Sequence, residues 1–253
     1  MNKIDYSGLT TYLFWSEMRS DLNRYLLGPI WWVLEPCLYV AVFYFAFAHL
    51  RGGAGEHVFL LLCGISVWHW ITSVINQGAN SLIKKKGILK SFSVHPIIFP
   101  LSTLLVHTFK FAIVLVCVMV VLWINDVFNF AGIPSFLLWI LACVLVCFSY
   151  AVNLSLIIPF APDLQLIISR AMMLLMFLSG VIFPIDNMSP TVQEFLFWNP
   201  FAHLIESGRK VMLYGESLDA VFMLIFIFIH IPLLLLGFFL LGKLRGEIPK
   251  RLV

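Results

Sequence analysis

The sequence predicts an all-α polytopic membrane protein with six transmembrane helices, an N-terminal amphipathic interface helix, and a re-entrant helical hairpin between spans 5 and 6. Of its 253 residues, 61% are hydrophobic and 11% are charged, whereas soluble domains have about 25% charged residues. Six apolar segments approach the roughly 20 residues that cross a bilayer, and two shorter helical patterns lie between the last two. No other stretch has the ~50 residues of a soluble domain, so any large cytosolic activity must belong to another polypeptide.

Residues 1–28 are expected to form a helix with two faces. At 100° per residue, one arc is apolar and largely aromatic, and the opposite arc is polar. The apolar arc contains Phe14, Trp15, Met18, Leu22, Tyr25 and Leu26, and the polar arc contains Ser16, Glu17, Ser20, Asp21, Asn23 and Arg24. A helix that lies in the membrane interface has this pattern, and so does a helix packed on a partner subunit.

Six spans follow within residues 29–253, and the charges that flank them predict the orientation. The expected spans are 30–50, 58–80, 101–124, 135–158, 167–184 and 218–241. Of the 16 lysines and arginines, 12 fall on the side of the two termini, Arg51, Arg209 and Lys210 fall on the other, and Lys110 lies within a span. The positive-inside rule therefore places both termini in the cytoplasm and the hairpin at 185–215 outside.

Two cytoplasmic connections, 83–100 and 159–168, are candidates for contact with a cytosolic subunit. The lysines of the first are also explained as an orientation signal and by attraction to anionic lipid. Its apolar stretch between Pro96 and Pro100 is not, because an apolar segment in such a loop is better buried against a partner. The residues expected to contact the subunit are Lys84, Lys85, Lys86, Lys90, His95, Pro96, Pro100 and Asp163.

Ionisable residues inside spans are costly and are therefore functional candidates. Glu35 precedes Pro36 in span 1, and Lys110 lies at a similar depth in span 3. We hypothesise that these two residues pair, or that Glu35 satisfies backbone groups freed by Pro36. The histidines are scattered without metal spacing, and the five cysteines lie in apolar segments outside any CxxC or Cys/His pattern. We interpret both sets as interface or packing residues and expect no metal site.

The aromatic residues of span 1 allow two interpretations. Trp31 and Trp32 fit the aromatic belts of membrane interfaces without any further function. Tyr39 and Tyr44 lie deeper, where a phenol needs a polar partner. Aromatic rings along a channel would suit a sugar chain, whose C–H faces stack on rings, whereas core packing is the competing explanation for each ring. The expected channel residues are Trp31, Trp32, Glu35, Tyr39, Phe43, Tyr44 and Lys110.

The segment 182–215 reads as a helical hairpin. Ser189 is an N-cap candidate followed by proline at the first helical position, and this helix is expected to stop before Pro200. A second short helix, 201–213, is expected to close at Gly215. Such backbone survives at membrane depth only where protein or a water-filled cavity covers it. The hairpin is therefore a natural lid over a pathway, and an external loop with two surface helices is the alternative.

No motif for covalent chemistry is present. The chain lacks the P-loop GxxxxGK[ST], the GxSxG motif, paired intramembrane carboxylates and metal-binding motifs. A proton-coupled carrier would need a titratable relay beyond one Glu–Lys candidate. The energy for active transport is therefore expected to come from another chain.

Three short motifs resemble those of the membrane permease of type-2 ABC exporters, in the subgroup that exports bacterial O-antigen of lipopolysaccharide or capsular polysaccharide. They are residues 25–36 (YLLGPIWWVLEP), similar to LGxxWxxxxP; residues 177–184 (FLSGVIFP), similar to SGxxFP; and residues 197–203 (FWNPFAH), similar to WNP. The likeness covers the whole chain and its six-span order. Pro29 departs from the bulky residue expected after Gly28, at the junction of the interface helix and span 1.

The resemblance implies a non-catalytic permease subunit in the bacterial inner membrane. It implies a homodimer bound to two copies of a separate ATPase that would hold ATP and Mg²⁺, with no cofactor in this chain and no nucleic acid partner. Residues 1–28 and both cytoplasmic loops would couple nucleotide state to the permease, and lipid-linked glycan would leave past the hairpins. The residues implied at this periplasmic gate are Phe183, Pro184, Trp198, Asn199, Pro200 and His203.

Two other interpretations stay open beside the polysaccharide exporter. A sibling permease for drugs, haem or teichoic acid would have the same fold. Deleting its gene would not leave long-chain glycan in the cytosol and a bare cell surface. A membrane scaffold or an intramembrane enzyme would act without an ATPase, as the purified chain alone.

Overall fold

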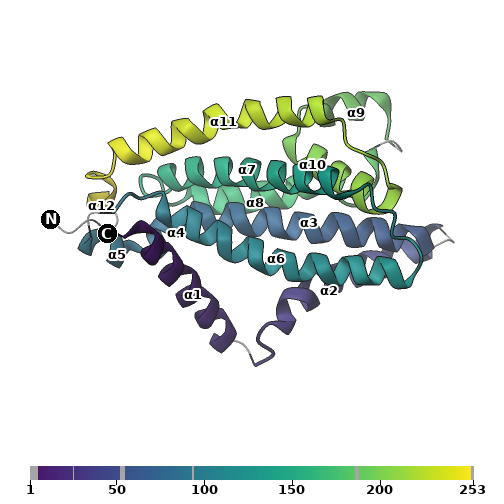
Figure 1. The fold of residues 1–253 in the computed structure, drawn as a ribbon, viewed down its shortest axis with the longest axis horizontal. Coiled ribbons are helices and arrows are strands. Elements are labelled where there is room, and N and C mark those ends of the chain that lie inside the picture. The colour runs from purple at the N-terminus through teal and green to yellow at the C-terminus, as the bar shows by residue number, and fades with distance from the viewer. Residues whose placement is uncertain (1–4, 25, 52–54, 93, 186–187, 252–253) are drawn as a thin grey trace.

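The computed structural model describes residues 5–24, 26–51, 55–92, 94–185 and 188–251, and every regular element in these ranges is a helix (Figure 1). The first half contains α1 (Tyr6–Arg24), α2 (Ile30–Arg51), α3 (Gly55–Ala79), α4 (Ser81–Lys84), α5 (Lys86–Ser91) and α6 (Ile98–Ile124). The second half contains α7 (Ile133–Ile157), α8 (Leu164–Phe177), α9 (Pro190–Phe197), α10 (Pro200–Arg209), the π-helical turn η2 (Lys210–Tyr214), α11 (Ala220–Lys243) and α12 (Ile248–Arg251). Figure 1 shows that α1 begins and α12 ends at one end of the bundle, and that α9 lies toward the opposite end.

Four helical segments among the described residues are long and apolar enough to cross a membrane. They are Val58–Ala79 of α3 and the whole of α6, α7 and α11. Two shorter apolar helical segments, Ile30–Val42 of α2 and α8, stand where spans 1 and 5 are expected. The all-helical, polytopic class is therefore confirmed.

The expected fifth span, 167–184, is wrong at its C-terminal end, because α8 stops at Phe177. The other expected spans match their helices to within three residues at each end. At Gly180 the chain turns with a φ of +69°, a left-handed conformation that favours glycine. The Gly180 carbonyl accepts a hydrogen bond from Arg209. A tertiary contact thus ends the helix, although the apolar sequence continues.

Helix α3 lies at the centre of the bundle, in contact with α2, α6, α7, α8 and α10. Small residues allow this close packing, as they do in many membrane helices. A Cβ atom added to Gly78 of α3 would lie only 2.7 Å from the Cβ atom of Ala151 in α7. The expectation that cysteines are packing residues holds for the buried ones, which are Cys63, Cys143 and Cys147.

A second apolar cluster lies at the end of the bundle where α1 begins. It joins residues of α1, α4, α5, α6, α7, α11 and α12. Val94, Ile98 and Phe99 belong to it and are at most 3% exposed. The apolar stretch between Pro96 and Pro100 is therefore buried by the chain itself and does not need a partner to cover it, because α6 begins earlier than expected and takes in these residues.

Helix α1 packs against α6, with the Phe14 ring on Phe109 and Asp21 paired with Lys110. Leu13, Glu17 and Asp21 share one face of α1 because side chains at i and i+4 are neighbours on a helix. The predicted apolar arc is only partly right. Met18 is buried at 4% exposure, but Trp15 is 56% exposed. Glu17 and Asp21, which belong to the polar arc, face the bundle.

Candidate functional site

A polar cavity of about 450 Å³ lies among α1, α2, α3, α4 and α6. Charged, hydroxyl, amide and indole groups line it, although α3 and α6 are apolar spans. The lining residues are Glu17, Asp21, Trp31, Trp32, Glu35, Ser66, His69, Trp70, Ser73, Gln77, Lys84, His107, Lys110, Phe111 and Val114. In the described ranges, no group of three or more His, Cys, Asp or Glu side chains is placed to hold a metal ion.

The polar wall follows from helical spacing. Four polar residues of α3 are three or four positions apart and so share one face: they are Ser66, His69, Ser73 and Gln77. Lys110 lines the same cavity from α6. Each residue alone is an isolated polar residue in an apolar span. Considered together, the polar residues on this face of α3 are the sequence signal that would have predicted the cavity.

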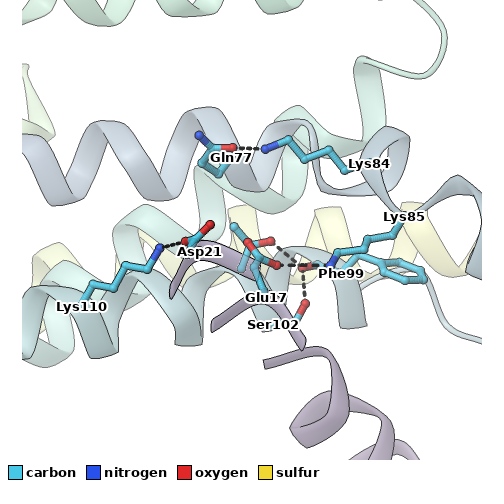
Figure 2. Close-up of polar contacts among 9 residues, drawn as sticks. Glu17, Asp21, Gln77, Lys84, Lys85, Phe99, Ser102 and Lys110 are labelled. Carbon is cyan, nitrogen blue, oxygen red and sulfur yellow. Dashed lines mark hydrogen bonds and ion pairs between the residues drawn. The ribbon is translucent and has the colours of Figure 1, made fainter. Parts of the chain in front are cut away.

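Two ion pairs join α1 to this region, as Figure 2 shows. Asp21 of α1 pairs with Lys110 of α6, and Glu17 Oε2 lies 3.5 Å from Lys85 Nζ. The Asp21 and Lys110 side chains are 29% and 14% exposed. Because partly buried pairs are screened less than surface pairs, this contact holds α1 against α6 more firmly than a surface ion pair would.

The hypothesised pair of Glu35 with Lys110 is wrong. Lys110 pairs with Asp21, and its Nζ also lies 5.4 Å from the Trp32 ring centroid, a cation–π distance. Glu35 Oε2 instead lies 3.5 Å from His69 Nε2. The hypothesis did not consider Asp21, which lies on the polar arc of α1 and supplies the counter-ion of Lys110.

Helix α1 determines the sign of the charge in the cavity. With the histidines uncharged, the wall carries two lysines, Lys84 and Lys110, and three carboxylates, those of Glu17, Asp21 and Glu35. The net charge is therefore −1. Since two of the carboxylates belong to α1, moving this helix away would leave a net charge of +1 on the remaining wall. The position of α1 and the electrostatics of the cavity are thus linked.

The expected channel residues only partly come together. Trp31 and Trp32 line the cavity with Glu35 and Lys110, and Trp31 is 36% exposed. Tyr39 is exposed and does not line it. The side chains of Phe43 and Tyr44 lie outside the described part of the structure. Glu17, Asp21, His69, Gln77, Lys84 and His107 were not predicted as channel residues.

The residues expected to contact a cytosolic subunit differ in burial and in their contacts within the chain. Lys84 donates to Gln77 Oε1 of α3, and Lys85 pairs with α1, so both interact within the chain (Figure 2). Pro96 and Pro100 are buried. Lys84, Lys86, Lys90 and Asp163 are exposed.

His95 is a packing residue in this structure. Its ring stacks on Phe238 of α11, with ring centroids 4.7 Å apart. Burial, and then the nearby Arg245, lower the pKa of His95, so the ring is uncharged near neutral pH. A Cβ atom on Gly242 would lie 3.0 Å from its Nε2. His95 thus packs the segment before α6 against α11.

The hairpin helices α9 and α10 lie where the sequence predicts them. Ser189 makes no side-chain cap bond, whereas Asn199 Oδ1 accepts a backbone N–H of α10 at 3.0 Å. Gly215 follows η2 with a φ of +65°, as its expected role in closing the helix requires. His203 Nε2 lies 2.8 Å from the Phe197 carbonyl oxygen, which joins the two helices.

The other expected gate residues differ in burial. Pro184 is buried and Phe183 is half-buried, whereas Trp198 is 84% exposed. Pro200 is the first residue of α10. Arg209 was not predicted as a functional residue. In the sequence it counted only as one of the basic residues on the side of the membrane opposite the termini. Arg209 is fully buried inside the hairpin region, and no sequence pattern marks it.

Comparison with known proteins shows similarity along most of the chain. The profile of a family described as "ABC-2 type transporter" matches residues 9–213. The polysialic acid transport protein KpsM of Escherichia coli is 23% identical over 233 residues, 87% of this chain and 90% of that protein. The O-antigen export system permease protein RfbA of Klebsiella pneumoniae is 24% identical over 237 residues, 90% of this chain and 89% of RfbA. The protein of the same name from Myxococcus xanthus is 21% identical over 218 residues, 85% of this chain and 84% of that protein.

Proposed function

We propose that this chain, which belongs to the ABC-2 type transporter family, is the permease subunit that exports a lipid-linked polysaccharide across the bacterial inner membrane. Its family makes it a multi-pass, non-catalytic transport subunit, and permeases of this family pair with an ATPase subunit. One observation is the main support for polysaccharide as the substrate class. Relatives named for polysialic acid transport and O-antigen export align with this chain over 78% or more of their own length.

The chemistry of the cavity supports a sugar substrate. Trp31 and Trp32 supply flat apolar faces on which the C–H faces of sugar rings stack. Glu35, His69 and Gln77 supply hydrogen-bonding groups for hydroxyls. A ligand site commonly combines aromatic walls with a few placed polar groups. A hydrophobic drug would not need so many hydrogen-bonding groups around one cavity.

We further propose the assembly in which this subunit works. Two copies of the chain form a homodimer that binds two copies of the ATPase, where ATP and Mg²⁺ are held. Helices α2 and α8 complete six spans with α3, α6, α7 and α11. The positive-inside rule supports cytoplasmic termini, which puts the α9–α10 hairpin on the periplasmic side as a gate.

Helix α1 is the proposed link between nucleotide state and substrate. It would lie at the cytoplasmic interface with the 83–100 and 159–168 segments, where an ATPase binds. Its carboxylates reach Lys85 and Lys110. A movement of α1 driven by the ATPase would therefore change the charge of the cavity, and with it the affinity for a polar headgroup.

Deletion of the gene tests this function. We expect the cell surface to lose one polysaccharide while the long-chain form of this polysaccharide accumulates in the cytosol. We expect the wild-type gene to restore the surface polysaccharide. An inactive variant of the ATPase should give the same phenotype as the deletion. A normal glycan surface together with changed resistance to drugs, or with changed haem handling, would contradict the proposal and favour a sibling permease.

A further inference from the structure

Arg209 is a charged residue that is completely buried. Its Nη1 donates to the Gly180 carbonyl at 2.7 Å, and its Nη2 donates to the Val181 carbonyl at 2.6 Å. Nη2 also lies 3.3 Å from the Leu60 carbonyl of α3, and Glu206 Oε2 lies 3.5 Å from Nη1. Burying a charge is costly unless it is paired and hydrogen-bonded. These contacts offset that cost, and they join three separate segments of the chain.

Helix α3 approaches Arg209 closely at Gly64. A Cβ atom on Gly64 of α3 would lie 2.5 Å from the Val181 carbonyl oxygen and 2.7 Å from Arg209 Nη2. Only glycine at this position allows α3 to approach the arginine and the carbonyl together. Arginine also suits the site better than lysine, because its planar fork directs several N–H groups in fixed directions.

A second residue holds the same turn from the other side. Asn199 Nδ2 donates to the Leu178 carbonyl at 2.8 Å and lies 2.9 Å from Ser179 Oγ. We call the four residues 178–181 the neck. Arg209 thus holds the second half of the neck, and Asn199 holds the first half.

The two contacts lie on either side of α9 along the chain. The chain leaves the neck after Val181, which Arg209 holds, and Asn199, just beyond α9, is bonded back to the neck. Between these points, α9 buries only Leu196, and its apolar side chains Val192, Phe195 and Phe197 are exposed. Helix α10 is different, since seven of its ten residues are buried. The hairpin therefore has a packed base and a projecting part.

We infer that Arg209 and Asn199 are positioning residues that lock the neck to α3 and α10, so that α9 moves about a base that stays fixed during transport. The neck and α10 then keep their contacts in every state of the pump. The role in gating rests on the proposed function, whereas the fixed neck does not.

Two variants separate the two contacts. Asn199→Asp keeps the oxygen that caps α10 and removes the amide donor to the neck. Arg209→Met removes the guanidinium while keeping a long side chain. The matched control is Lys210→Met, which makes the same change in charge at the next residue. If Arg209→Met does not fold, Asn199→Asp alone still tests the inference.

The experiment uses the full chain with its ATPase in lipid bilayers and has two measurements. Hydrogen exchange of the amides at 178–182 should be about tenfold faster or more in both variants, as expected when a local structure opens more easily. It should stay within about twofold of wild type in Lys210→Met. Passive leak of a small dye without ATP should also rise in both variants but not in the control.

The possible results separate the fixed neck from its role in gating and from the proposed function. Unchanged exchange in folded Asn199→Asp and Arg209→Met would overturn the inference even if glycan export is established. Faster exchange without any leak would keep the fixed neck and refute its role in gating. If the wild-type complex moves no glycan, the proposed function fails, and the exchange measurement still tests the neck.

Discussion

Asp21→Lys is expected to abolish export, and Lys110→Asp in the same chain is expected to restore part of it. The single change places two lysines face to face where an ion pair holds α1 against α6. Breaking a fully buried pair costs roughly 3 to 5 kcal/mol. These side chains are partly exposed, so we expect the substitution to destabilise the docked position of α1 by about 1 to 3 kcal/mol. That corresponds to a shift of roughly 5- to 150-fold in the docking equilibrium.

Surface polysaccharide per copy of the chain in the membrane is the measurement. In Asp21→Lys this amount of surface polysaccharide should fall to background while the chain is still inserted in the membrane. The double variant should recover a clear fraction of wild-type export. The control is Ser20→Lys, which places the same lysine at the exposed neighbouring position and should export normally. Normal export by Asp21→Lys would show that the ion pair does not couple α1 to transport.

Gly237→Leu is expected to prevent the assembly of α11 on α7. Among the described helices these two share the most extensive contact. A Cβ atom on Gly237 would lie 2.7 Å from Val152 Cγ1 and 2.9 Å from Asn153 Nδ2. The same Nδ2 donates to the Leu233 carbonyl at 2.8 Å, so the larger side chain also breaks a hydrogen bond between helices.

The expected cost is about 3 to 5 kcal/mol, from overpacking and the lost hydrogen bond together. This is a large part of the 5 to 15 kcal/mol that stabilises an ordinary folded protein. Size-exclusion chromatography of the extracted protein should show aggregate in place of the wild-type peak. Gly246→Leu is the matched control, because a Cβ atom there has no neighbour within 4 Å. A wild-type profile for Gly237→Leu would mean that the α7–α11 contact can open without unfolding.

The sequence predicted the helices well where lipid decides their limits. A membrane requires about 20 apolar residues in a row, so hydropathy locates α3, α6, α7 and α11 closely. It misplaced the end of α8, because Arg209 and Asn199 stop that helix from a distance of about 20 to 30 residues along the chain. The start of α9 and the break before α10 were predictable, since the prolines at positions 190 and 200 act locally.

The candidate site was predictable only in part. Trp31, Trp32 and Lys110 stood out because aromatic and charged residues are conspicuous in spans. Glu17 and Asp21 did not, because carboxylates on an amphipathic helix are usually solvated, and only docking of α1 on the bundle brings them to Lys85 and Lys110. The buried state of Arg209 depends on the carbonyls that converge on it, and no local pattern encodes such a convergence.

The central claim is that this chain is the membrane half of an ATP-driven exporter. Gentle extraction from its native membrane, with identification of what accompanies it in stoichiometric amount, tests the claim most directly. We predict one ATPase chain for each copy of this chain, in a complex that contains two of each. Recovery of this chain alone, under conditions that keep other ABC complexes whole, would contradict the claim and favour a scaffold.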